Sequence, residues 1–86
     1  MYYRRKLLLA LLQELGGKVA GTDFQKYLFM LSQYRTKAPY NFVPYAFGCF
    51  SFQSYADKRA LAYYGLLQST EDWVTSANNV NYAESL

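Results

Sequence analysis

The chain has 86 residues, which is the size of one domain, and its single cysteine excludes an internal disulfide. It has no histidine, which excludes the catalytic triads and metal sites that depend on this residue. The formal net charge of +3 is unevenly distributed, because residues 1–37 hold seven of the nine Lys and Arg, whereas residues 38–86 hold four of the six Asp and Glu.

The first predicted element is a helix from Tyr2 to Leu15, ended by Gly16 and Gly17. Its apolar face is formed by Leu7, Leu8, Leu11, Leu12 and Leu15. The basic cluster Arg4, Arg5 and Lys6 lies in the first turn, where the helix dipole disfavours cations. Such a cluster is either a solvated basic end or a site for an external anion.

This opening segment also raises the question of a signal peptide, because basic residues precede a run of leucines. Gln13 and Glu14 interrupt the run, which is too short to span a bilayer, and no small-residue cleavage site follows. We therefore predict a soluble, cytoplasmic protein without a membrane partner.

A second helix is predicted from Thr22 to about Tyr34, with Thr22 and Gln25 forming a capping box. One apolar stripe contains Phe24, Tyr27, Leu28, Leu31 and Tyr34. Phe29 and Met30 lie on the far side, beside Lys26 and Gln33. These two residues either pack against a later part of the chain or contact a partner protein.

A strand is predicted from Phe42 to Tyr45, at a sheet edge because of Pro44, and it continues to Phe47 if the pattern extends. Gly48 predicts a turn. A third helix then runs from about Phe52 to Tyr64, capped by Ser51 and ended by Gly65. Its exposed arc is predicted to contain Ser54, Asp57 and Lys58, and its buried arc Phe52, Ala56, Ala60 and Tyr63.

The last predicted element is a small hairpin of Leu66–Gln68 with Trp73–Thr75. Residues 77–86 are polar and are predicted to form a loosely ordered tail, so the domain spans residues 1–76. The order helix, helix, strand, helix, short hairpin predicts a mostly helical α+β fold with a winged-helix-like arrangement.

Two stretches of the sequence resemble a known family. Phe24–Gln33 resembles the "LQKLLYFAQ"-like helix of the Panacea (SocA-like) antitoxin domain, and Tyr45–Ser51 resembles the aromatic–Tyr–Gly–Pro turn of that group, with Cys49 in place of the proline. The opening from Tyr2 to Leu67 is also similar to an N-terminal extension of larger bacterial proteins of unknown function. The resemblance implies a non-catalytic bacterial or phage regulator that binds a protein, typically a toxin.

The sequence contains no catalytic, metal-binding or cofactor-binding motif, so we predict that the protein is not an enzyme and uses no cofactor. A glycine-rich phosphate loop and a defensible acid–base pair of carboxylates are both absent from the sequence. Cys49, between Phe47 and Phe50, is predicted to be a small buried hydrophobic residue rather than a nucleophile.

Two binding functions remain open. The ten tyrosines and six phenylalanines are too many for the interior of so small a domain, and exposed aromatic residues are typical of protein interfaces. We therefore favour binding of a protein, a toxin or a second copy, through Lys26, Phe29, Met30 and Gln33. The alternative is a winged-helix DNA-binding regulator that uses Arg4, Arg5, Lys6, Lys18, Lys26, Arg35, Lys37, Gln53, Ser54 and Lys58.

Overall fold

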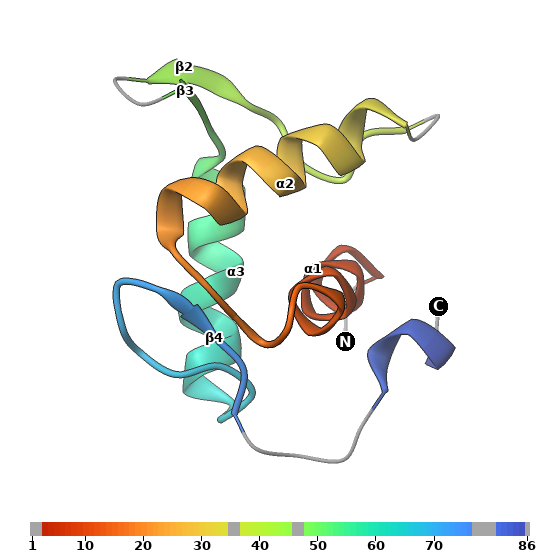
Figure 1. Cartoon of the computed structure of the whole chain (residues 1–86), viewed down its shortest axis with the longest axis vertical. Helices are drawn as coiled ribbons and strands as arrows, with labels where there is room; N and C mark the ends of the chain where they lie inside the picture. Colours follow the sequence, from red (N-terminus) through yellow and green to blue (C-terminus); the bar gives the residue numbers. More distant parts are fainter. Residues whose placement is uncertain (1–2, 35–36, 46–47, 77–80, 86) are drawn as a thin grey trace.

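The computed structural model describes residues 3–34, 37–45, 48–76 and 81–85 (Figure 1). This part of the chain contains three α-helices: α1 (Tyr3–Glu14), α2 (Gly21–Gln33) and α3 (Phe52–Tyr63). The strands are β1 (Lys18–Val19), β2 (Val43–Tyr45), β3 (Gly48–Phe50) and β4 (Trp73–Val74), and a 3₁₀ helix, η1, spans Tyr82–Ser85. The prediction of a mostly helical α+β fold is therefore confirmed.

The predicted ends of α3 are confirmed in atomic detail. The hydroxyl of Ser51 accepts a hydrogen bond from the Ser54 N–H at 3.1 Å, which caps the start of the helix. Gly65 has a φ of 78°, and the Leu66 N–H donates to the Leu61 carbonyl at 2.9 Å. This is the hydrogen-bond pattern of a Schellman motif, in which glycine adopts the left-handed conformation without steric cost.

Gly16 ends α1 with the same hydrogen-bond pattern, as predicted. The capping box predicted at the start of α2 is wrong. The φ of Gly16 is 98°, and the Gly17 N–H donates to the Leu12 carbonyl at 2.9 Å. Thr22 lies inside α2, whose N-cap residue is Ala20 without a side-chain cap. Gln25, the other residue of the predicted capping box, is buried and binds Ser51 and Ser54 instead.

β4 pairs with a partner that the sequence did not indicate. It runs antiparallel to β1, with Lys18 opposite Val74 and Val19 opposite Trp73. On its other side, Leu67 forms an antiparallel bridge with Thr75, and the Gln68 N–H donates to the Val74 carbonyl at 2.8 Å. The predicted hairpin is thus reduced to this bridge, and residues 18 and 19, predicted as part of a connection, form a strand.

The second sheet is a hairpin of β2 and β3, with Val43 opposite Phe50 and Tyr45 opposite Gly48. β2 confirms the predicted strand. Gly48 lies in β3 rather than at the predicted turn, and the connecting residues 46 and 47, with the proposed extension to Phe47, lie outside the described residues. The side chain of Cys49 is also outside the described part of the chain.

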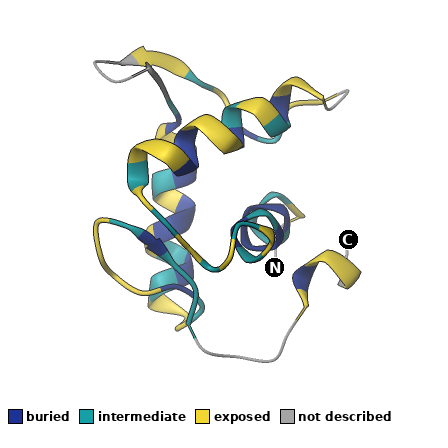
Figure 2. Ribbon diagram, viewed as in Figure 1, coloured by how far each residue is buried: buried dark blue, intermediate teal, exposed yellow. Residues whose placement is uncertain are grey.

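The core joins the three helices to β4 (Figure 2). The Trp73 indole stacks on the Phe24 ring, with the ring centroids 4.3 Å apart, and both residues are fully buried. Tyr82 of η1 is also buried, and its N–H donates to the Gln13 side chain at 3.1 Å. Tyr82 is therefore part of the core of the molecule, although the sequence placed it in a polar tail.

Candidate interaction surface

A buried carboxylate, Asp57, determines which side of α3 faces the core. Its side chain is 0% exposed and accepts hydrogen bonds from Arg4 Nε at 2.8 Å, Arg5 Nε at 2.9 Å and the Tyr40 hydroxyl at 2.8 Å. Burial raises the pKa of the Asp57 carboxyl, but the hydrogen bonds from Arg4, Arg5 and Tyr40 outweigh it and hold the pKa below its ordinary value. Asp57 therefore remains ionised and joins α3 to α1.

A neutral polar cluster joins α3 to α2 in the same way. The Gln25 amide donates to the Ser54 hydroxyl at 2.9 Å, and its oxygen accepts from the Ser51 N–H at 2.9 Å. The Ser54 hydroxyl donates to the Ser51 carbonyl at 2.8 Å. These buried groups satisfy one another, which removes the cost of taking them out of water.

Lys58 is the third polar residue on the inner side of α3, and it holds the loop before β4. Its ammonium group donates to the Thr70 carbonyl at 2.7 Å and to the Glu71 carbonyl at 3.2 Å. The same group lies 5.0 Å from the centroid of the Trp73 ring. The side chain is only 8% exposed, and burial lowers the Lys58 pKa, opposed by the nearby carboxylates of Asp72 and Glu71.

Because Ser54, Asp57 and Lys58 face inward, α3 turns its opposite side toward solvent. We call Phe52, Ala56, Arg59 and Tyr63 the outward stripe; all four are exposed, Phe52 by 65% and Tyr63 by 85%. Their spacing of three or four residues places them on one side of the helix. The predicted orientation of α3 is therefore wrong. Of the arc expected to be buried, Phe52, Ala56 and Tyr63 are exposed and Ala60 is half-buried. The arc expected to be exposed, Ser54, Asp57 and Lys58, is buried.

A groove of about 670 Å³ runs along one edge of the outward stripe. It lies between α3 and the loop of residues 68–72 and is lined by Tyr55, Lys58, Arg59, Ala62, Gln68, Ser69, Thr70 and Glu71. Arg59 belongs to both the groove and the outward stripe, so the two form one continuous surface.

The predicted protein-interface residues on α2 are divided by the structure. Lys26, Met30 and Gln33 are exposed, together with Tyr27 and Tyr34. Phe29 is half-buried and packs edge-on against Phe42, with the ring centroids 5.3 Å apart. Phe29 therefore packs against a later part of the chain, which is the first of the two interpretations. Met30 lies on the surface.

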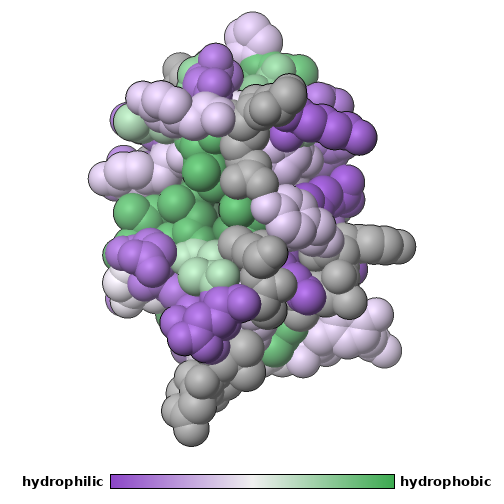
Figure 3. Space-filling view, turned by 90° about the vertical axis from the view of Figure 1, so that its right-hand side faces the viewer, coloured by the Kyte–Doolittle hydropathy of each residue, from purple (hydrophilic) through white to green (hydrophobic). Residues whose placement is uncertain are grey.

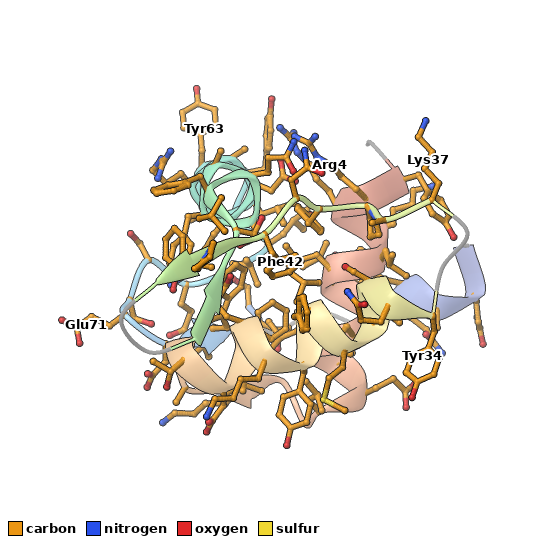
Figure 4. The ribbon with its side chains drawn as sticks, turned by 90° about the horizontal axis from the view of Figure 1, so that it is seen from above. Arg4, Tyr34, Lys37, Phe42, Tyr63 and Glu71 are labelled. Carbon is orange, nitrogen blue, oxygen red and sulfur yellow. The ribbon has the colours of Figure 1, made fainter. Side chains whose placement is uncertain are left out.

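Exposed aromatic residues thus lie on opposite sides of the molecule. Figure 4 shows Tyr34, the residue that directly follows α2, projecting from one side of the molecule. Tyr63 and Arg4 project from the other side. Apolar surface also reaches the side that carries α1 and η1, where it is interrupted by hydrophilic residues (Figure 3).

The residues predicted to contact DNA do not form one surface. Ser54 and Lys58 are buried, and Arg4 and Arg5 form ion pairs with Asp57. Lys6 and Gln53 are half-buried, and the Gln53 side chain accepts from the Asn41 N–H at 2.8 Å. Lys18, Lys26 and Lys37 are exposed at separate positions on β1, α2 and the segment before β2. Arg35 lies outside the described residues.

Sequence reasoning missed the outward stripe as a surface, although it recognised that α3 has an apolar and a polar side. Predicting the orientation of α3 requires the hydrogen-bond partners of Ser54, Asp57 and Lys58, which lie 12 to 53 positions away in the sequence.

In the described part of the chain, no group of three or more Asp, Glu or Cys residues is placed to hold a metal ion. None of the helices described has the length and hydrophobicity needed to cross a bilayer.

Comparisons of this chain with models of protein families, with curated proteins and with solved structures gave no match.

Proposed function

We propose that this chain is a non-catalytic protein-binding module whose main contact surface is the outward stripe of α3. The observation that supports this proposal is the orientation of the helix. Each polar residue of its inner side has hydrogen-bond partners within the chain, whereas Phe52 and Tyr63 on the outer side are mostly exposed to water. Aromatic residues presented in this way are enriched in protein interfaces and often contribute most of the binding energy.

We propose a winged-helix-like arrangement as the architecture of this module. Three features support it: the order α1, β1, α2, α3, β4; the pairing of β1 with β4; and the bridge between Leu67 and Thr75 on the other side of β4. The loop of residues 68–72 then corresponds to the wing, and β2 and β3 form an insertion between α2 and α3. In such a fold, α3 occupies the place of the recognition helix, which presents its outer side to a partner.

A toxin-neutralising or regulatory role of the Panacea type is one specific form of this proposal. The two stretches that resemble that family are in direct contact, because the Ser51 N–H donates to Gln25 at 2.9 Å. The resemblance therefore covers a single packing unit formed by α2, β3 and the start of α3. A toxin or another bacterial protein is the partner that it implies.

DNA binding is the second candidate, and it is favoured by the order and pairing of the helices and strands. The charged residues of the chain argue against it. Arg4 and Arg5 are joined to Asp57, Lys58 is buried, and the loop in the place of the wing carries Glu71 and Asp72, which repel phosphates.

A site-specific photocrosslinker tests the protein-binding proposal. We expect benzoylphenylalanine in place of Tyr63 to form covalent adducts with a defined protein in a bacterial lysate, and the same residue in place of Gln33 on α2 to form far fewer. Equal labelling at both positions would contradict the assignment to α3. Fluorescence anisotropy with a labelled random duplex, at low and physiological salt, tests the second candidate, because the salt slope counts the phosphates contacted.

A further inference from the structure

The outward stripe carries a pair of aromatic rings at each end. At its start, the Phe52 ring packs edge-on against Phe50 of β3, with the ring centroids 4.7 Å apart. At its end, Tyr63 packs edge-on against Tyr64, with the ring centroids 5.4 Å apart. Phe52 and Tyr63 are eleven positions apart on α3, which corresponds to about 17 Å along the helix axis. The stripe therefore has large rings at both ends, and the small Ala56 lies between them.

The order of large and small residues along the stripe is complementary to its own reverse. When a second copy of α3 packs antiparallel on the first, with Phe52 opposite Tyr63, the same register sets Ala56 opposite Arg59. The aromatic ends then pack on one another, and the aliphatic part of each Arg59 side chain covers the small Ala56. Each of these contacts occurs twice, because a two-fold axis makes every contact reciprocal.

The charges along the groove are also self-complementary. Arg59 and Glu71 are exposed and line the groove together. Glu71 lies level with the middle of α3, because Lys58 donates to the Glu71 carbonyl at 3.2 Å. In an antiparallel pair, the two-fold axis is perpendicular to the plane of the two helices, so the groove edges of both copies lie on the same side of that plane. The cation of each copy then lies near the carboxylate of the other, whereas a partner with charges of one sign would meet a like charge.

We propose that the outward stripe is the interface of a two-fold symmetric dimer, in which α3 packs antiparallel on α3 of a second copy of the chain. Phe52 and Tyr63 supply the apolar contacts at each end of this interface, and Arg59 and Glu71 of opposite copies fix its register. The proposal rests on the proposed function, because it names a second copy as the partner at the same surface.

The exposed area is sufficient for a dimer of modest stability. Phe52, Tyr63 and Tyr64 are 65%, 85% and 67% exposed, and together they offer about 400 Å² on each copy. A two-fold interface uses this area twice. With the rest of the outward stripe and the exposed residues 68–71, the buried area reaches about 1,200 Å², the lower end of the range for specific interfaces. We therefore expect a dissociation constant of about 10–100 µM.

Sedimentation equilibrium of the full chain, at about 5 to 500 µM, tests the proposal. We expect the mean mass to rise with concentration from the 10.0 kDa of one chain toward twice that value. Tyr63→Ala, shown to be folded by circular dichroism, should weaken the dimer about tenfold. Tyr34→Ala is the matched control, because Tyr34 is 86% exposed on the opposite side of the molecule, and it should change the dissociation constant less than about twofold (Figure 4). Equal weakening by both variants would overturn the proposal.

Charge reversal tests the register of the two helices. Arg59→Glu should weaken the dimer about tenfold, because it sets two carboxylates against each other on the groove side. Adding Glu71→Lys to the same chain restores opposite charges between the copies and should recover most of the affinity. A double variant as weak as Arg59→Glu alone would overturn the antiparallel register.

The photocrosslinker at Tyr63 separates this proposal from the proposed function. In the purified chain, we expect a covalent dimer in which the tryptic peptide of residues 60–86 is joined to that of residues 38–58, which contains Phe50 and Phe52. A purified chain that forms no covalent dimer and keeps the mass of one chain at every concentration would overturn the second copy as the partner. The proposed function would then stand if the same probe captured a different, defined protein from a lysate. No adduct in either experiment would overturn both.

Discussion

The carboxylate of Asp57 on α3 accepts a hydrogen bond from Arg4 on α1 at 2.8 Å, across 53 positions of the sequence. Tyr40, in the segment before β2, donates to the same carboxylate at 2.8 Å. One buried charge therefore fixes three parts of the chain relative to one another. Because a buried charge without partners is very costly, this cluster strongly favours the observed rotation of α3, with Tyr63 outward and Leu61 inward.

Replacing Asp57 with Asn should destabilise the protein by about 3 kcal/mol, because Arg4 and Arg5 then keep their charges without the carboxylate. Urea unfolding followed by circular dichroism measures this change. Glu14→Gln, at an exposed position near the end of α1, is the control and should alter the free energy of unfolding by no more than about 0.5 kcal/mol. Equal stability of Asp57→Asn and the wild type would show that the cluster does not hold α3 in place.

The same cluster predicts how stability depends on pH. The pKa of the Asp57 carboxyl is held below its ordinary value of 3.8 in the folded protein, so the unfolded chain takes up the proton first as the pH falls. The stabilisation is therefore fully present above about pH 4 and is lost as the pH falls through the folded pKa. In urea unfolding at a series of acidic pH values, the wild type should lose stability below about pH 4 more steeply than Asp57→Asn. Parallel acid profiles would contradict the lowered pKa.

Gln25→Ala should destabilise the protein by roughly 2 kcal/mol, because it leaves the buried Ser51 N–H without an acceptor and removes the donor to the buried Ser54 hydroxyl. Gln33→Ala, on the exposed side of the same helix, serves as the matched control and should have little effect. Thermal unfolding of the two variants gives the comparison. If the melting temperature fell equally in both variants, the loss of stability would come from a change in helix propensity and not from the loss of the buried hydrogen bonds.

The local features of the fold could be predicted from single residues, whereas the orientation of α3 could not. Ser51 and Gly65 mark the ends of α3 because capping and the left-handed conformation depend on the residue itself and its immediate neighbours. The side of α3 that is buried depends on Arg4, Gln25 and Thr70, which are remote in sequence. A polar residue predicts exposure only when no partner is placed to meet it, and sequence spacing does not show those partners.

The strand β1 illustrates the same limit on a smaller scale. Lys18 and Val19 are too few to show an alternating pattern, so nothing local indicates a strand. These two residues form a strand because the packing of Trp73 on Phe24 places β4 beside them. Tyr82 is similar: its burial depends on the surface of α1 that it meets, and its polar neighbours in the sequence predict the opposite.

Phe29→Ala and Met30→Ala should behave differently although the residues are adjacent. Phe29 packs on Phe42, so its loss should lower the free energy of unfolding by about 2 kcal/mol, less than for a fully buried phenylalanine. Met30 is 54% exposed, and its replacement should change stability by less than about 0.5 kcal/mol. Urea unfolding of the two single variants measures both values. Equal destabilisation would mean that Met30 also belongs to the core.

Phe52→Ser and Tyr63→Ser together should leave the fold and its stability almost unchanged. Both side chains are exposed, so their removal opens no cavity, and the buried contacts of Asp57, Lys58 and Leu61 are unaffected. The melting temperature should stay within about 2 °C of the wild type, and the protein binding that we propose for α3 should be lost. Leu61→Ser, on the inner side of the same helix, is the matched comparison and should unfold the protein at a much lower temperature. If the exposed pair instead proved as destabilising as Leu61→Ser, the outward stripe would be part of the core, and α3 would have the orientation that its sequence predicts.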